Sequence, residues 1–113
     1  MPEIHDPDSG RLDAKRIGSL FGITLADVAR LLRRDLSTVH KTPDAPSLQP
    51  GLALFERVGA PLLYLAGSPQ NLRIWLNAPN PDLEDEAPLA LLKNGEGVTV
   101  VELLEDALVG QPG

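Results

Sequence analysis

The stretch PLALLKNGEGVTVVELLEDALVG, residues 88–110, decides the fold class of this chain. It predicts two helices. The first begins at Pro88, because proline favours the first helical position, and ends at Asn94-Gly95. The second runs from Val98 to about Val109 and ends at Gly110. Apolar residues recur at helical spacing in both, at Leu89, Leu91, Leu92, Val101, Leu104 and Leu108.

Two further helices are predicted upstream. Ser68-Pro69 combines an N-cap with proline at the first position and opens a helix through Leu76. An amphipathic helix is expected from about Gly51 to Leu65, in which Pro61 produces a kink or starts a new segment. No segment shows the alternation of a strand, so we predict an all-α fold.

The proline content marks the domain boundary. Residues 42–50 hold three prolines and form the clearest linker. We therefore expect a flexible arm over residues 1–10, a helix-turn-helix subdomain over residues 11–45, and a second helical domain over residues 46–113.

The helix-turn-helix prediction depends on spacing. One helix is expected over residues 12–21, stopped by a glycine, and the next begins after Thr24, with Asp27 three positions later near its positive end. Ala29 and Val39 are ten positions apart, as a small residue at the helix crossing and its packing partner should be. Arg33 occupies the turn position where glycine is common, so a tight left-handed turn is less expected here.

The second helix of this unit would be the one that reads DNA. Short hydroxyl donors and cations near its start suit phosphates and base edges in a major groove. The candidate DNA-binding residues are Arg34, Ser37, Thr38, His40 and Lys41. The alternative is a helical hairpin that only packs.

Composition narrows the protein class. The 113 residues are 42% hydrophobic but only 4% aromatic, so the core must be aliphatic and a permanent partner or an oligomer would add stability. Residues 11–41 hold seven basic and three acidic residues, whereas residues 51–113 hold three basic and nine acidic ones. Cysteine is absent, and no signal peptide or membrane span is evident, so we expect a cytoplasmic protein.

The residues of an enzyme are missing from the sequence. His5 and His40 are isolated, so no metal site is predicted. The acidic run at residues 82–86 is more simply a solvated loop than a pair of catalytic carboxylates. No serine has a neighbouring base, and no glycine loop could cradle a phosphate. We therefore predict no catalytic activity and no cofactor.

The C-terminal part resembles a known family. It has Trp75-Leu76, an Asn-rich turn over residues 77–80, the Pro-Leu-x-Leu-Leu helix from Pro88, a glycine at Gly95 or Gly97, and a last helix with spaced valine and leucine. This pattern is similar to the toxin-binding domain of the Xre/MbcA/ParS antitoxin family, in which an upstream helix-turn-helix is the expected partner.

The resemblance implies a function. Family members neutralise RES-type toxins or related ADP-ribosyl-transfer folds that use NAD, by placing the C-terminal end in or over the active-site cleft. They commonly dimerise, and they often repress their own promoter. The expected partners are thus a cognate toxin, operator DNA and a second copy of the chain. Two alternatives remain: a stand-alone Xre-like transcriptional regulator, and a protein-binding adaptor that never meets DNA.

The resemblance also suggests which residues touch the toxin. The core is expected to take Trp75, Leu76, Leu92, Val101 and Leu104. Polar and terminal positions around it are then the candidate toxin contacts, namely Arg73, Glu84, Asp85, Glu86, Glu102, Glu105, Asp106, Val109, Gly110 and Gln111. Relatives often have Leu-Gly-Gly where this chain has Leu83-Glu84-Asp85-Glu86, so the turn should adopt another conformation or face a basic toxin surface.

Overall fold

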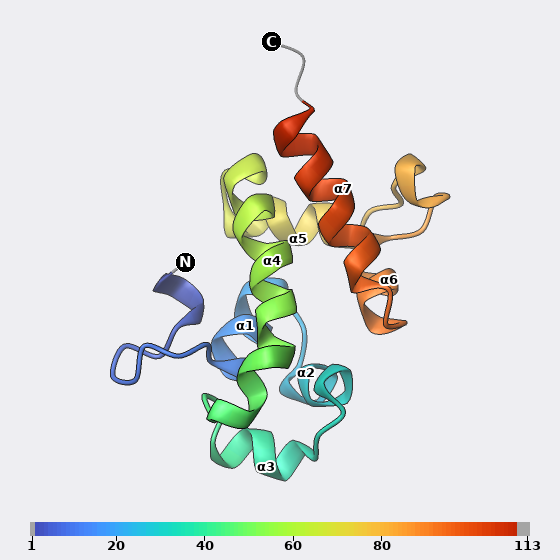
Figure 1. Cartoon of the computed structure of the whole chain (residues 1–113). Coiled ribbons are helices and arrows are strands. Elements are labelled where there is room, and N and C mark those ends of the chain that lie inside the picture. Colours follow the sequence, from blue (N-terminus) through green and yellow to red (C-terminus); the bar gives the residue numbers. More distant parts are fainter. Residues whose placement is uncertain (1, 111–113) are drawn as a thin grey trace. The chain divides into compact units, whose positions relative to one another are not determined.

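The computed structural model describes residues 2–110, and this part of the chain is all helical (Figure 1). Its α-helices are α1 (Ala14–Phe21), α2 (Leu25–Leu32), α3 (Leu36–Lys41), α4 (Gln49–Ala66), α5 (Pro69–Asn77), α6 (Pro88–Lys93) and α7 (Gly97–Val109). Short 3-10 turns lie at η1 (Pro2–Ile4), η2 (Pro46–Leu48) and η3 (Pro81–Leu83). Extended pairing within the described residues is confined to two isolated bridges. The predicted all-α fold class is confirmed.

The chain divides into two compact units, one ending at Glu56 and the other beginning at Arg57. The division falls inside α4 and not at residue 45, where the sequence predicts it. The first turns of α4 pack within the first unit. The Phe55 ring meets the Phe21 ring edge to face, with 5.4 Å between centroids. Gly51, with no side chain, leaves room for Leu32.

Local side-chain chemistry begins and ends the first two helices. The Asp13 carboxylate accepts hydrogen bonds from two backbone N–H groups in the first turn of α1, and Gly22 ends that helix in the left-handed conformation with φ 72°. Thr24 and Asp27 form a reciprocal capping box at the start of α2. The predicted stop at Gly22 and the predicted cap at Thr24 are both confirmed.

The turn between α2 and α3 is tight. Arg33 lies in the left-handed region with φ 56°, and its N–H bonds back to carbonyl groups of α2. A left-handed turn therefore forms without the glycine that usually favours it. On either side of the turn, Ala29 and Val39 are buried, with 2% and 0% of their surface exposed. The predicted positions of the small residue and of its partner are thus both interior.

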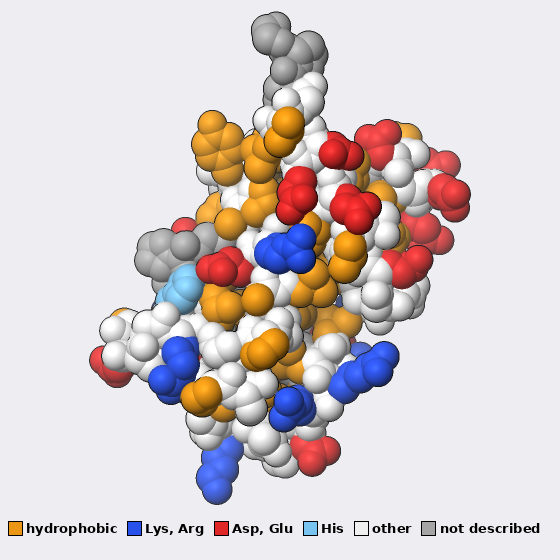
Figure 2. Space-filling model, viewed as in Figure 1, with side chains coloured by type: hydrophobic (Ala, Val, Ile, Leu, Met, Phe, Trp, Pro, Cys, Tyr) orange, Lys and Arg blue, Asp and Glu red, His pale blue; other side chains and the backbone are white. Residues whose placement is uncertain are grey.

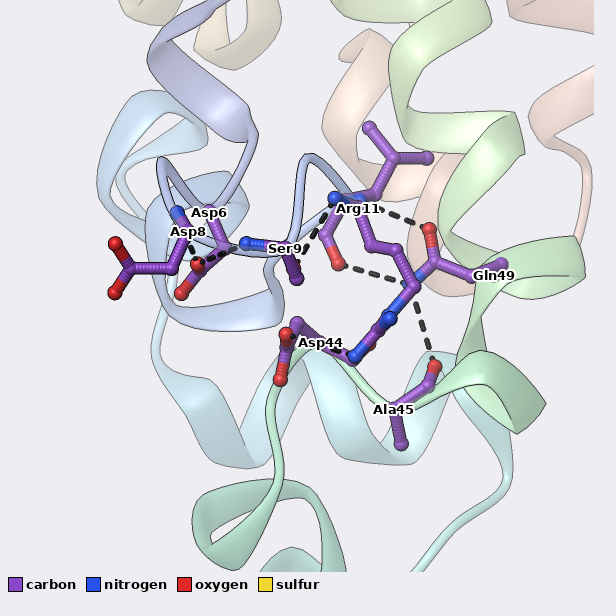
Figure 3. Close-up of polar contacts among 8 residues, drawn as sticks. Asp6, Asp8, Ser9, Arg11, Asp44, Ala45 and Gln49 are labelled. Carbon is purple, nitrogen blue, oxygen red and sulfur yellow. Dashed lines mark hydrogen bonds and ion pairs between the residues drawn. The ribbon is translucent and has the colours of Figure 1, made fainter.

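Residues 3–10 make several contacts within the first unit, although a flexible arm over residues 1–10 is expected from the sequence. Ile4 is completely buried, and its carbonyl accepts a hydrogen bond from the Asp13 N–H at 2.9 Å. The Asp6 carboxylate accepts from the N–H groups of Asp8 and Ser9 at 2.8 and 3.0 Å (Figure 3). The buried Ile4 side chain and the self-capped turn at Asp6 help to hold this segment, and the sequence pattern does not reveal either.

The proline-rich segment is also fixed in place. Arg11 donates from Nε to the Asp44 carbonyl at 2.8 Å and pairs with the Asp44 carboxylate at 3.2 Å (Figure 3). The Ala14 N–H donates to the carbonyl of Pro43 at 2.9 Å. Gln49 reaches back to both backbone groups of Leu12. The segment before α4 is therefore part of the first unit and does not act as a free linker.

The second unit holds the last turns of α4 and the helices α5, α6 and α7. Pro61 lies inside α4 without ending it, so no new helix starts there, although proline removes one backbone donor from the helix. The Ser68 hydroxyl caps α5 by accepting from the Asn71 N–H at 3.1 Å, as predicted. Predicted starts at Pro88 and near Val98 match α6 and α7. None of the helices in residues 2–110 is both long enough and apolar enough to cross a membrane.

The core of the second unit is aliphatic. Its buried side chains include Val58, Leu62, Leu72, Leu76, Leu83, Leu89, Leu91, Leu92, Val100, Val101 and Leu104. Trp75, which the sequence assigns to the core, is only half-buried because it borders an open pocket. Leu65 and Leu108 lie in the predicted apolar stripes, yet 41% and 40% of their surfaces are exposed.

Candidate functional site

An apolar pocket opens on the surface of the second unit. Its volume is about 220 Å³. Three helices and the loop after α5 line it, with Leu62, Leu65, Ala66, Trp75, Asn80, Asp82, Leu103, Leu104 and Ala107. Large exposed apolar side chains lie on the same helices, including Tyr64 at 80% and Val109 at 87% exposure. Figure 2 shows hydrophobic side chains gathered over the ends of α4 and α7. An exposed apolar surface of this kind marks a site of interaction.

Acidic side chains lie beside this apolar surface. The second unit carries eight acidic and three basic residues in its sequence. Glu102, Glu105 and Asp106 are exposed on α7, and Figure 2 shows the acidic groups there and over the loop between α5 and α6. Arg57 is 3.5 Å from Glu105, an exposed ion pair that offsets little of the negative charge.

The acidic loop between α5 and α6 has an unusual backbone. Glu84 and Asp85 are consecutive and both left-handed, with φ 56° and 64°. Left-handed backbone usually favours glycine, and neither of these two residues is glycine. Asn80 holds the loop: its side chain accepts from the Asp82 N–H at 2.9 Å, and its backbone carbonyl accepts from Asp85 at 2.9 Å. These bonds offset the steric strain of the left-handed residues and present their carboxylates outward.

The five candidate DNA-binding residues are together on the first unit. Arg34, Ser37, Thr38, His40 and Lys41 are all exposed at the α2–α3 turn and on α3, while Val39 faces the core. Arg34 donates to the Ser47 carbonyl at 3.4 Å, a long bond that leaves the guanidinium at the surface. Arg33, which sequence reasoning left out, adds a further exposed cation at this turn.

Two other cations of the first unit are engaged in ion pairs. Arg30 is 2.9 Å from Asp27 on the same helix, and Arg11 is paired with Asp44. Among the described residues, no ion pair involves Arg33, Arg34 or Lys41. Helix α3 is only six residues long. The surface thus offers a small group of available cations and not a broad basic face.

No candidate metal centre is found in residues 2–110. They contain no group of three or more histidine, cysteine or acidic side chains placed to hold a metal. His5 lies 3.5 Å from Glu56, and His40 is exposed on α3. The pKa of the Asp6 carboxyl is lowered by hydrogen bonds from the N–H groups of Ser9 and Asp8. This shift is explained by the turn itself.

One family model matches the chain. It describes the C-terminal toxin-binding domain of the Xre/MbcA/ParS antitoxins and matches residues 62–108. Residues 62–108 are a toxin-binding domain of this antitoxin family. The match starts in the last turns of α4 and runs almost to the end of α7. It supports the resemblance seen in the sequence and implies a cognate toxin as partner. No match was found among curated proteins or among solved structures.

The toxin-binding domain contains most of the candidate contact residues. Glu84, Asp85, Glu86, Glu102, Glu105 and Asp106 are exposed within it, and Arg73 is half-buried on α5, with its carbonyl accepting from the Asn77 side chain at 2.8 Å. Val109 and Gly110 are exposed just beyond the matched range. Gln111 lies outside the described residues. Sequence reasoning missed the pocket, because it treated Trp75 as core.

Proposed function

We propose that this chain is the antitoxin of a type II toxin–antitoxin pair. It neutralises a RES-type or ADP-ribosyl-transfer-like toxin that uses NAD, by covering the toxin's active site. It is not an enzyme, and it acts in the cytoplasm as a homodimer and in complex with the toxin. The family match over residues 62–108 carries this proposal. The acidic, partly apolar surface of the toxin-binding domain supports it, since such a surface suits a protein partner.

Co-expression tests the neutralising function. The protein encoded beside this chain should halt growth and deplete cellular NAD when expressed alone, and this chain should restore both. The two proteins should also co-purify. Deleting α7 would remove buried Val100, Val101 and Leu104, so loss of rescue by that deletion would not locate the contact surface. A neighbour that is harmless, or toxic with or without this chain, would refute the proposal.

Charge reversal tests the contact surface without disturbing the core. Glu84→Lys combined with Asp85→Lys changes two exposed residues of the toxin-binding domain. We expect slower association with the toxin and loss of its salt dependence. The matched control is Glu3→Lys combined with Asp8→Lys, two exposed residues of the first unit. Equal effects of both pairs would mean that only net charge matters.

We further propose that the first unit binds operator DNA and represses the chain's own operon. Available cations at the α2–α3 turn and the hydroxyl donors of α3 support this role. Arg34→Ala and Lys41→Ala should weaken operator binding and lower its salt slope by about one for each phosphate that is no longer neutralised. Lys93→Ala is the control, because Lys93 is an exposed cation of the second unit. An unchanged slope would favour a protein that binds only other proteins.

The second candidate function is a stand-alone transcriptional regulator. The helix-turn-helix arrangement of α2 and α3 is the observation that favours it. It predicts tight operator binding by the chain alone and no toxic neighbour. Growth rescue in the co-expression experiment separates it from the antitoxin.

A further inference from the structure

The pocket at Trp75 has the size and lining of a socket for one side chain. Its volume is about 220 Å³, and its walls come mainly from leucine and alanine of α4 and α7 and from the Trp75 ring of α5. A cavity of about 150 Å³ lined by aliphatic and aromatic groups is enough to bind benzene. One phenylalanine or leucine side chain therefore fits.

Apolar side chains line the mouth of the pocket, and acidic side chains lie at its edge. Leu65, a wall residue, and Leu108 are each about two-fifths exposed, at 41% and 40%. Asp82 belongs to the lining itself. Asp106 is three residues from Leu103 on α7 and therefore lies beside it on the helix surface. An apolar centre with charged groups at its edge is the usual arrangement of a protein interface.

The negative charge around the pocket favours one kind of occupant over another. A second copy of this chain would bring its own eight acidic and three basic residues of the second unit towards the same acids, and like charges oppose that contact. A partner segment in which one large apolar side chain is flanked by lysine or arginine would satisfy both the pocket and the carboxylates.

We infer that the pocket at Trp75 receives one large apolar side chain of the toxin, and that the toxin segment carrying it is basic. This inference rests on the proposed antitoxin function. Trp75 forms a wall of the socket, and Asp82 and Asp106 hold the flanking cations. The pocket then anchors the toxin, while the exposed acids set the orientation of docking.

The chain contains a single tryptophan, which makes occupancy of the pocket directly observable. Labelled with fluorinated tryptophan, the full-length chain gives one fluorine NMR signal, from Trp75. The probe is the protein encoded beside this chain, in a catalytically inactive form, and co-purification first establishes that the two bind. We expect the Trp75 signal to shift on addition of this protein and to stay constant when the labelled chain alone is diluted.

Two kinds of variant then test the occupant. Ala107→Phe fills the pocket from α7 and should weaken binding about tenfold or more, as blocking a central anchor does. Asp106→Lys leaves the pocket open but should weaken binding more than Glu105→Lys does, because residue 105 points away from Leu103 on the same helix. Thermal unfolding checks that each variant is folded. If Ala107→Phe does not fold, the comparison of Asp106→Lys with Glu105→Lys alone tests the inference.

The outcomes separate this inference from the proposed function. Failure of the wild-type chain to co-purify with the neighbouring protein refutes the antitoxin function, and the inference with it. Binding with an unmoved Trp75 signal and equal affinities for all three variants overturns the inference alone. A signal that shifts with the concentration of the labelled chain alone assigns the pocket to a second copy, which also overturns it.

Discussion

The side-chain amide of Gln49 hydrogen-bonds to both backbone groups of Leu12. Its Oε1 accepts from the Leu12 N–H at 2.9 Å, and its Nε2 donates to the Leu12 carbonyl at 2.9 Å. The two residues are 37 positions apart, yet the amide pairs with Leu12 as a neighbouring strand would. This pairing joins the start of α4 to the segment before α1, and it completes the first unit.

Replacing Gln49 should therefore weaken the first unit. Gln49→Ala leaves the N–H and carbonyl of Leu12 without partners in a part-buried position, and we expect a loss of about 1–3 kcal/mol in the free energy of unfolding. Urea denaturation followed by circular dichroism measures it. Gln70→Ala, at an exposed position of α5, is the control and should change little. Equal stability of the two variants would show that water replaces the amide at no cost.

A glycine at the α2–α3 turn should stabilise the protein. Arg33 has φ 56°, which is unfavourable for a residue with a Cβ atom. We expect Arg33→Gly to raise the free energy of unfolding by up to about 1 kcal/mol, reduced by the greater freedom of glycine in the unfolded chain. Arg33→Ala removes the same charge but keeps the Cβ atom. If both variants shift the melting temperature equally, the charge and not the backbone is responsible.

Glycine in the acidic loop should raise the stability of the protein but weaken its binding to the toxin. Glu84 and Asp85 are both left-handed, so Glu84→Gly with Asp85→Gly relieves strain of about 1 kcal/mol or more and should raise the melting temperature. The same change removes two exposed carboxylates and should slow association with the toxin. Asparagine tolerates this conformation without charge, so Glu84→Asn with Asp85→Asn separates the effects. Unchanged association for both double variants would exclude the loop from the interface.

Acid should loosen the N-terminal turn through Asp6. The N–H groups of Ser9 and Asp8 lower the pKa of the Asp6 carboxyl in the folded chain. A lowered pKa gives stability that is complete above the unfolded-state pKa and is lost as the pH falls through the folded-state pKa. Asp6→Asn keeps an acceptor oxygen but does not titrate, so the pH dependence of unfolding should flatten on the acid side. Hydrogen exchange of the Ser9 amide, followed as a function of pH, measures this effect. Identical pH profiles for the wild-type chain and Asp6→Asn would show that the lowered pKa of Asp6 has no effect on stability.

Local chemistry made the helices predictable. Thr24 with Asp27, Ser68 with Pro69, and Gly22 each act within one turn of the helix that they begin or end, so the sequence alone reveals them. Helix periodicity likewise gave the apolar positions of α6 and α7. The toxin-binding domain could be predicted from the same stretch because its pattern is nearly continuous along the chain.

Long-range contacts were not predictable in this way. Gln49 acts on Leu12, and the burial of Ile4 depends on neighbours that have no sequence signature. Because of these contacts, the segments expected to be an arm and a linker belong to the first unit. Trp75 was misplaced for a related reason: an aromatic residue at helical spacing fits a core and a pocket wall equally well. Arg33 and Glu84 show that surrounding bonds can impose a left-handed backbone that residue preferences disfavour.

Because α4 runs unbroken from Gln49 to Ala66 while the units divide after Glu56, neither half of the chain is an interchangeable module. In a chimera joined at the proline-rich segment, the first unit would lose the buried side chains of Leu52 and Phe55. This loss would leave a cavity in its core. Recombination that exchanges either half between proteins must therefore cross over within the shared helix, in register, and beyond Glu56.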